Sequence, residues 1–419
     1  MPATLSPILK QATPVQVATG RGAVLTDIHG REYLDFTAGI GVTSTGHCHP
    51  KVVAAAQEQV ARLIHGQYTT VMHQPLKQLT QRLGEVLPAG LDSLFFANSG
   101  SEAVESALRL ARQATGRPNV IAFHGGFHGR TVGAASVTTS GTKFRTGFAP
   151  LMGGVAVSPF PAAIRLGMGI EEATDFALRE LDHLLHTISD PRDTAAFIIE
   201  PILGEGGYLP TPARFLHGLR ERADHHAILL ILDEVQTGAG RTGRFWAQEH
   251  SGVVGDILVT AKGIASGFPL SAMAASGDLM AKALPGSQGG TYGANAVACA
   301  AAVATLDVIE QEKLVENSRD LGQVLLDDLA AVAADTARIR DVRGLGLMVG
   351  VELCAEDGRP DPALATAVQQ NAVEEGLLLL TCGTANNVVR FIPPLVVRRE
   401  QIDVGVAAFS RALDRALER

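Results

Sequence analysis

Short runs of apolar residues alternate with helical patterns through the middle of the chain. The helical patterns include residues 105–114 and 213–226. Strands that alternate with helices form parallel βαβ units, and strands buried on both faces consist almost entirely of apolar residues. The pattern therefore predicts an α/β fold with a mostly parallel central sheet covered by helices. The predicted strands are SLFFA (93–97), NVIAF (119–123), AAFII (195–199), AILLIL (227–232) and ILVTA (257–261).

A different pattern follows the βαβ series. A long helical stretch at 294–312 leads away from it, and three strand-like runs follow, VRGLGLMVGVEL, GLLLLTCG and VVRFIPPL, with a helical pattern between the first two. Apolar residues between 402 and 413 recur at helical spacing. A hairpin pattern, TDIHGREYLD, lies near the N-terminus. We expect an N-terminal segment at 1–49 that packs with the small domain or across a dimer interface, a large domain at 50–312 and a small α+β domain at 313–419.

Composition narrows the possible partners. Of the 419 residues, 46% are apolar, and 35 basic against 43 acidic residues give a net charge of −8. This charge argues against a nucleic acid as partner, because phosphate binding needs clustered Lys and Arg. No apolar run reaches the roughly 18 residues that span a bilayer, and MPATLSPILKQATP contains no secretion signal, so we expect neither a membrane partner nor secretion. The four cysteines are dispersed along the chain, which favours a cytoplasmic protein with reduced thiols. We expect GHCHP (46–50) to form a turn rather than a metal site.

Polar and charged residues follow directly after each predicted strand of the large domain. In an open parallel sheet the carboxyl ends of the strands lie at one edge, and ligands bind in the crevice beside it. A sheet that served only as a packed core would have little reason to end five strands in this way. We therefore expect a site at this edge, formed by Asn98–Glu102, His124–Arg130, Glu200 with Glu205, Asp233–Gln236 and Lys262.

Each of these residues also has a purely structural interpretation. Residues 99–102 form a capping-box pattern, and capping alone would explain them. Asp233 could pair with a core arginine or cap a helix, and Arg130 and Arg390 could form surface ion pairs. Lys262 is the hardest to explain structurally, because burial disfavours an ammonium group at the end of a core strand.

The chemistry of a buried lysine suggests a cofactor. A lysine with a lowered pKa is a nucleophile toward aldehydes and forms a Schiff base with them. Pyridoxal 5'-phosphate (PLP) is such an aldehyde, and its phosphate would suit the helix start at Gly100 and Ser101. Its ring nitrogen needs a carboxylate, which Asp233 can supply, and its flat ring would pack on an aromatic face such as Phe127. Together with Lys262, these residues predict a PLP site.

Seven segments carry a family resemblance, and they occur in the family's order over nearly the whole chain. They are NSGSEAVESALRLAR, GGFHGRT, EPILGEGG, LDEVQTGAGRTG, AKGIASGFPLS, GGTYGANAVACAAA and RGLGLMVGVEL. With these segments the sequence resembles the class III aminotransferases, a branch of the fold-type I PLP enzymes. The closing GLLLLTCGTANNVVRFIPPL is most similar to 4-aminobutyrate aminotransferases. The resemblance implies a homodimer with active sites at the subunit interface, each completed by the neighbouring chain.

The resemblance also assigns roles to individual residues. Lys262 matches the lysine that binds PLP, and Asp233 matches the partner of the ring nitrogen. Arg130 matches the arginine that binds a substrate carboxylate in 4-aminobutyrate enzymes. Glu205 and Arg390 match a pair in which the arginine binds the carboxylate beside the reacting carbon of a 2-oxo acid, and the glutamate covers the arginine when the donor lacks that group. The other predicted cofactor-binding residues are Gly100 and Ser101 at the phosphate, Phe127 and Val235 on the ring faces, Gln236 at the ring hydroxyl, His128, Glu200, and Thr291 from the partner subunit.

These features predict a PLP-dependent transaminase with ping-pong kinetics. The expected amino donor is an ω-amino acid, with 4-aminobutyrate as the best candidate, and the expected acceptor is 2-oxoglutarate, with pyridoxamine phosphate formed between the two half-reactions. Ornithine, lysine and acetylornithine are alternative donors, and an amino-acid racemase of the same family is a second hypothesis. A nicotinamide dehydrogenase is disfavoured because residues 344–350 do not match GxGxxG. The polar and charged residues at the ends of five strands argue against a non-enzymatic binding protein.

The sequence departs from the family pattern in two places. Many relatives have EPVQGEGG, whereas Leu203 replaces the glutamine here, so we expect a less polar wall near Glu200. The family often shows TYGGNPLACA, where this chain has Ala294 and Ala296 in place of a glycine and a proline. We expect Thr291 to keep its phosphate contact, although the following helix could start differently.

Overall fold

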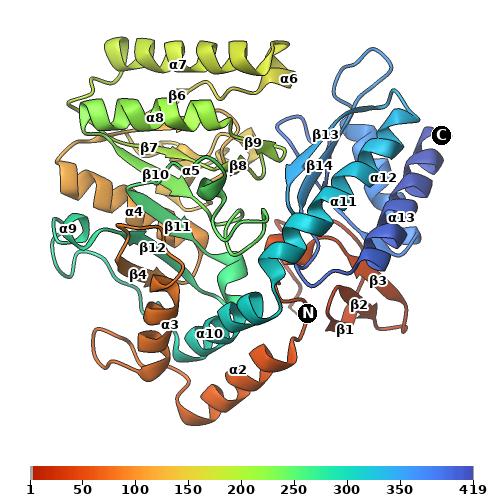
Figure 1. Ribbon diagram of the computed structural model, residues 1–419, viewed down its shortest axis with the longest axis horizontal. Coiled ribbons are helices and arrows are strands. Elements are labelled where there is room, and N and C mark those ends of the chain that lie inside the picture. The colour runs from red at the N-terminus through yellow and green to blue at the C-terminus, as the bar shows by residue number, and fades with distance from the viewer. Residues whose placement is uncertain (1–2, 419) are drawn as a thin grey trace.

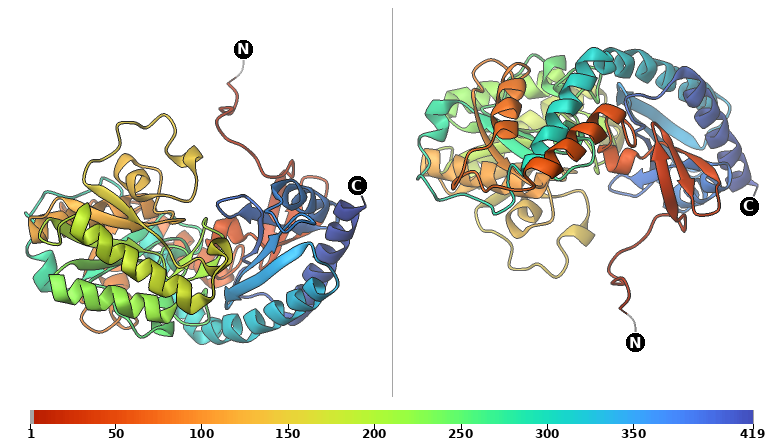
Figure 2. Two further views of the ribbon diagram at one scale, coloured as in Figure 1. Left: turned by 90° about the horizontal axis from the view of Figure 1, so that it is seen from above. Right: turned by 90° about the horizontal axis from the view of Figure 1, so that it is seen from below.

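The computed structural model describes residues 3–418, which form a large α/β body and a smaller body that contains the C-terminal strands and helices (Figure 1). The first described residues extend away from both bodies (Figure 2). Within the described range no helix combines the length and the apolar character needed to cross a membrane.

The large body is built on one seven-stranded sheet. All neighbouring strands are parallel except that β12 runs antiparallel to both β4 and β11. Since β12 is antiparallel to both neighbours, β4 runs in the same direction as β11, and five strands that precede predicted site residues end at the same edge. The spatial order is β4 (Ser93–Ala97), β12 (Ser271–Ala275), β11 (Ile257–Thr260), β10 (Leu229–Asp233), β7 (Thr194–Ile199), β5 (Asn119–Phe123) and β6 (Val155–Ser158).

Helices cover both faces of this sheet, as the almost wholly apolar strands require. On one face, α7 (Ile170–Thr187) and α8 (Ala213–His226) pack through a core that includes Phe197, Phe215 and Leu232 (Figure 1). On the other face, α4 (Gly100–Thr115) and α5 (Val132–Val137) bury the alternate residues of the same strands. The mostly parallel, helix-covered sheet predicted from the sequence is confirmed.

A helical layer connects the large body to the small one. Helix α10 (Ala296–Gln311) packs against α2 (Pro50–Arg62) and α3 (Gln74–Gly84), and α11 (Leu314–Ala334) then reaches the small body. There, α11, α12 (Pro362–Glu374) and α13 (Arg399–Leu417) cover an antiparallel sheet. Its strand order is β13 (Ile339–Leu345), β14 (Met348–Leu353), β17 (Val388–Phe391) and β16 (Leu380–Cys382).

The N-terminal strands form a third sheet beside the C-terminal helices (Figure 2). Strand β15 (Leu377–Leu378) pairs with β3 (Glu32–Asp35) in parallel. On its other side β3 pairs with β2 (Val24–Asp27), and β2 pairs with β1 (Val17–Arg21), both antiparallel. The remaining short elements are α1 (Ala38–Gly41), η1 (Thr142–Phe144), α6 (Ala163–Leu166), β8 (Ile202–Leu203), β9 (Leu209–Pro210), η2 (Ala247–His250), η3 (Lys262–Ala265) and α9 (Gly277–Met280).

Candidate active site

Asp233 lies at the end of β10, where it forms the floor of the site. Its side chain is only 3% exposed; Oδ1 accepts a hydrogen bond from the backbone N–H of Val235 at 3.0 Å, and Oδ2 lies 2.8 Å from Nδ1 of His128. Burial alone would lower the pKa of His128, but the hydrogen bond and charge of Asp233, followed by the charge of Glu200, produce a net increase. The hydrogen bond to His128 therefore fixes the orientation of the buried carboxylate.

Glu200 follows β7 and holds two loops of the site together. Its carboxylate accepts hydrogen bonds from the backbone N–H groups of Phe127 at 2.8 Å and Gly204 at 2.9 Å. Burial, opposed by the charge of His128, raises the pKa of Glu200 to about 7. In this structure Glu200 thus joins the Phe127 loop to the loop that carries Glu205.

Lys262 follows β11 and begins the short helix η3, with a positive φ of 47° that is unusual for a residue other than glycine. Burial lowers the pKa of its amine below the ordinary value, although the charges of Glu205, Asp233 and Glu200 act in the opposite direction. An amine with a lowered pKa is more often neutral, and a neutral amine is the form that acts as nucleophile or base.

The N-terminus of α4 is capped by its own residues and lies in contact with two neighbouring loops. Ser99 and Glu102 form the capping box that the sequence allowed as an alternative to phosphate binding. The two interpretations are compatible, because a helix start presents several backbone N–H groups that the helix itself does not use. A Cβ added to Gly100 would lie 2.9 Å from a Val235 methyl group, and the Arg130 backbone N–H donates to Ser101 Oγ at 3.1 Å. The loops after β5 and β10 therefore meet at this helix start.

An aromatic pair and an arginine form one wall. The rings of Phe127 and Phe144 meet edge to face with centroids 4.9 Å apart. The guanidinium carbon of Arg130 lies 4.9 Å from the centre of the Phe144 ring and 6.0 Å from that of Phe127. Because Arg130 is exposed, its charge is available to a ligand beside this wall.

Glu205 and Arg390 form an ion pair of 2.5 Å between the large body and β17 of the small body. The Arg390 side chain is 6% exposed and that of Glu205 19%. Burial would raise the pKa of Glu205, but the charge and hydrogen bond of Arg390 lower it overall. The sequence placed these two residues in one pair, and the structure brings them into contact although 184 residues lie between them.

Three further residues donate hydrogen bonds to the backbone around Glu205. The carbonyl oxygen of Glu205 accepts a hydrogen bond from Gly383 N–H at 2.9 Å, and Arg343 donates twice to the carbonyl of Gly207 at 3.0 and 2.7 Å. Arg165 donates to the carbonyl of Gly206. The sequence analysis did not identify either arginine, and only the position of Arg343 within the RGLGLMVGVEL segment offered a signal.

Thr291 is exposed, and no hydrogen bond within residues 3–418 joins it to the groups described above. Its predicted partner-subunit role stays a prediction. Ala294 adopts φ 54°, a left-handed conformation that suits the glycine of relatives, and Asn295 caps α10 through Val297 N–H and Ala298 N–H. The substitutions at Ala294 and Ala296 are therefore compatible with an ordinary helix start.

Leu203, the other departure, is fully buried in an apolar cluster that includes Phe123 and Phe160. A Cβ on Gly125 or Gly206 would lie 3.0 or 2.9 Å from its side chain. Leu203 thus packs beneath the Glu205 loop in apolar surroundings. The less polar wall expected near Glu200 stays a prediction.

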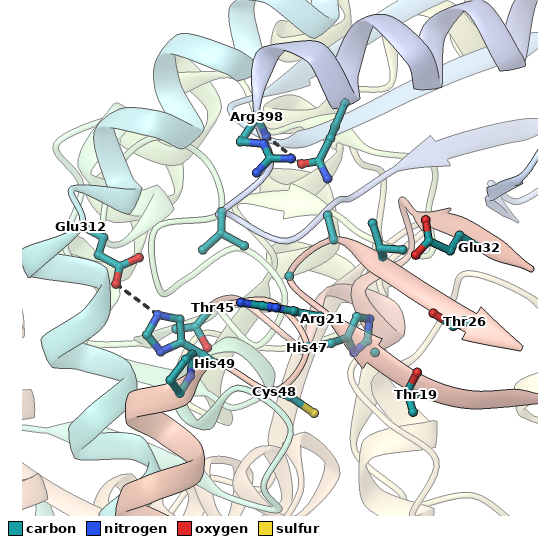
Figure 3. Close-up of a pocket in the computed structure, with 17 residues that line it drawn as sticks. Thr19, Arg21, Thr26, Glu32, Thr45, His47, Cys48, His49, Glu312 and Arg398 are labelled. Atoms are coloured by element: carbon teal, nitrogen blue, oxygen red, sulfur yellow. Dashed lines mark hydrogen bonds and ion pairs between the residues drawn. The ribbon is translucent and has the colours of Figure 1, made fainter. Parts of the chain in front are cut away.

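Two cavities differ in their relation to these residues. A cavity of about 210 Å³ is lined by Glu205 and Lys143 among others. A larger one, of about 880 Å³, lies between the N-terminal sheet and the start of α13, and its lining includes Arg21, His47 and Arg398 (Figure 3). None of the predicted site residues lines the larger cavity, so the chemistry is assigned to the sheet edge. In the predicted turn beside it, His47 lies 2.7 Å from Asp35 and His49 3.1 Å from Glu312.

Comparison with known proteins identifies the family. The family model "Aminotransferase class-III" matches residues 8–413. The chain belongs to the class III aminotransferases. It is 41% identical to the 5-aminovalerate aminotransferase DavT of Pseudomonas putida over 95% of this chain and 93% of the relative. It is 40% identical to the 4-aminobutyrate aminotransferase GabT of Escherichia coli over 97% and 95% of the two chains.

A solved structure agrees with this assignment. An amine transaminase from an uncultivated Pseudomonas species, in its PLP-bound form, superposes with a TM-score of 0.93 at 31% identity, covering 99% of both chains. The resemblance to class III aminotransferases and the fold-type I architecture are thereby confirmed. The chain is a PLP-dependent aminotransferase, as its family is.

The residues of this aminotransferase fit PLP chemically. Lys262 provides an amine of lowered pKa, Asp233 provides a buried carboxylate, and the start of α4 provides backbone N–H groups for a phosphate. The side-chain oxygen of Gln236 is buried and has no hydrogen-bond partner within residues 3–418. A buried polar atom without a partner is costly, and a polar group of the cofactor would satisfy it.

Proposed function

We propose that this aminotransferase transfers the amino group of an ω-amino acid to 2-oxoglutarate. The observation that carries this proposal is the ion pair between Glu205 and Arg390. Such a pair keeps the arginine neutralised for a donor that has no carboxylate beside its amine, and leaves it available to an oxo acid that has one. A buried arginine without either partner would be strongly disfavoured.

The donor is expected to bind through its distal carboxylate. Arg130 stands on the aromatic wall with its guanidinium exposed, and a guanidinium binds a carboxylate bidentately. The names of DavT and GabT, 5-aminovalerate and 4-aminobutyrate aminotransferase, support a donor of four or five carbons. We propose 4-aminobutyrate as the preferred donor, with 5-aminovalerate as a close second.

Lys262 and Asp233 would each contribute to the proton transfer. PLP supplies an aldehyde that takes up the amine and a protonated ring that accommodates the electrons released when the neighbouring carbon loses its proton. Lys262 would hold the cofactor in the resting protein and would then carry the proton between two carbons, which its lowered pKa favours. Asp233, oriented by His128, would provide the carboxylate for the ring nitrogen. Repeating these steps with the oxo acid gives ping-pong kinetics.

We also propose that two copies of the chain form the active sites jointly, with Thr291 of one copy at the phosphate site of the other. Large apolar side chains are exposed around the end of α2, in the segment that follows it and at Tyr292, next to Thr291. Apolar residues gathered in this way mark interaction surfaces. The apolar residues of the first two regions are Val60, Leu63, Ile64, Val71 and Met72.

A panel of amines tests the proposal. Glutamate formed from 2-oxoglutarate would be measured with 4-aminobutyrate, 5-aminovalerate, ornithine, lysine, acetylornithine and butylamine, which lacks the distal carboxylate. We expect the first two donors to give the highest kcat/KM. Arg130→Leu should lower kcat/KM for 4-aminobutyrate by about 100-fold and leave the rate with butylamine nearly unchanged. Equal activity with butylamine and 4-aminobutyrate in the parent, or racemisation of an amino acid without an oxo acid, would contradict the proposal.

A further inference from the structure

The cavity of about 210 Å³ brings a second cation close to Glu205. Lys143, on the short helix η1, lines this cavity together with Glu205 and Asn386. Its ammonium nitrogen lies 3.5 Å from Oδ1 of Asn386 and 5.0 Å from the centre of the Phe144 ring. The Lys143 side chain is exposed, so it is free to reorient.

On the proposed function, the charges of the site change between the two half-reactions, and this change gives Glu205 a need for a second cation. With an ω-amino acid bound, Arg130 meets the distal carboxylate of the donor and Arg390 meets Glu205. Both arginines and Glu205 then have a partner of opposite charge. When 2-oxoglutarate replaces the donor, its two carboxylates occupy Arg130 and Arg390, and Glu205 loses its partner. Most of the Glu205 side chain is buried, and a buried carboxylate without a partner is costly.

Three cationic side chains act on Glu205 in this structure. Burial raises its pKa, and Arg390, Lys262 and Lys143, in decreasing order of influence, lower it. The oxo acid occupies Arg390. The amine of Lys262 is engaged with the cofactor and the proton transfer. Among the three, Lys143 alone has no task in either half-reaction, and it lines the same cavity as Glu205.

We propose that Lys143 is the alternative partner of Glu205: when a 2-oxo dicarboxylate binds Arg390, the glutamate side chain turns into the small cavity and pairs with Lys143. Lys143 is then a positioning residue that favours the acceptor without contacting it. A monocarboxylate that binds only Arg130 leaves Glu205 on Arg390, and so does not depend on Lys143.

Binding of unreactive analogues to the PLP-loaded enzyme tests this inference. Glutarate carries two carboxylates and butyrate carries one, and calorimetry gives the Kd of each for the parent, Lys143→Met and Lys143→Arg. We expect Lys143→Met to weaken glutarate binding about 5- to 10-fold, the effect of losing one partly exposed ion pair, with butyrate unchanged. Lys143→Arg should restore glutarate binding. Lys77→Met, which removes one exposed lysine from α3, is the matched control for net charge.

The same measurement in a Glu205→Gln background separates the alternatives. Glutamine needs no cation, so Lys143→Met should have no further effect on glutarate there. A loss of glutarate binding that persists in this background would mean that Lys143 contacts the ligand itself, and equal losses for glutarate and butyrate would mean general attraction of anions. An unchanged Kd in Lys143→Met would exclude the pairing. Each of these results overturns the inference alone, whereas failure of the parent to bind glutarate overturns the proposed function as well.

Discussion

His128 and Asp233 form a pair at the floor of the site, 2.8 Å apart, with side chains only 1% and 3% exposed. The histidine has a raised pKa, so folding favours its protonated form. A group of this kind contributes stability that is fully present below the unfolded-state pKa, about 6.5 for histidine, and is lost as the pH rises through the folded-state pKa.

This pairing predicts a pH-dependent difference in stability. His128→Gln keeps a hydrogen-bond donor but cannot carry the charge. We expect the free energy of unfolding of the parent to exceed that of the variant most at pH 6, and the difference to shrink as the pH rises above about 6.5. Denaturant unfolding of the cofactor-free protein between pH 6 and 9 would measure it. A difference that stays constant with pH would show that the pKa of His128 does not change on folding.

Lys262 is predicted to be indispensable for turnover. Lys262→Ala should lower the transamination rate by about 10²- to 10⁴-fold, the usual contribution of a positioned proton carrier. It should also abolish covalent retention of PLP after borohydride treatment. Absorbance of the denatured, dialysed protein would report the retained cofactor. Lys77→Ala, in an exposed lysine of α3, serves as the control and should behave as the parent.

Arg390 is predicted to act on the acceptor half-reaction. Lysine at this position would still neutralise Glu205 but lacks the planar fork that binds a carboxylate bidentately. We expect Arg390→Lys to raise KM for 2-oxoglutarate by about 10-fold or more, and to change KM for 4-aminobutyrate by less than about 2-fold. Stopped-flow kinetics of the separate half-reactions would measure both. Equal effects on the KM values of the two substrates would contradict a role of Arg390 in binding the acceptor alone.

The close approach of Gly100 and Val235 predicts that even one methyl group is harmful at this helix start. Gly100→Ala would place its Cβ 2.9 Å from Val235 Cγ1, which must shift. We expect a loss of about 1–3 kcal/mol in the free energy of unfolding and weaker binding of PLP, measured by equilibrium dialysis. Gly84→Ala is the control, because outside its own stretch of helix backbone no atom lies within 4 Å of the added Cβ. Removing the Val235 methyl groups in the double variant Gly100→Ala/Val235→Ala should restore part of the lost free energy of unfolding.

The sequence predicted the large sheet well where strands are buried on both faces, because such strands read as uninterrupted apolar runs. It missed β12, whose sequence SAMAA consists mainly of small residues without β-branching, and β6, whose side chains are mostly only half-buried. It also treated RGLGLMVGVEL as one strand. Gly346, with φ 54°, turns this segment into the hairpin of β13 and β14. Similarly, GLLLLTCG divides between two sheets as β15 and β16.

For the site, sequence reasoning depended on the direction of the strands. Residues that follow parallel strands must meet at one edge, so the proximity of Asp233 and His128 could be anticipated. The hydrogen bonds from Arg165 and Arg343 could not, because they reach backbone carbonyls of the Glu205 loop and leave no pattern of residue types. The position of Lys143 depends on the irregular loop around η1, for which periodicity gives no information.

The main chain at Glu205 is held by Gly383 on one side and by Arg343, through Gly207, on the other. Any exchange of its carboxylate between partners is therefore a matter of side-chain torsions, which relax in picoseconds to nanoseconds where space allows. Closing lids and moving domains take microseconds to milliseconds. The proposed exchange of partners at Glu205 therefore needs no movement of a lid or a domain.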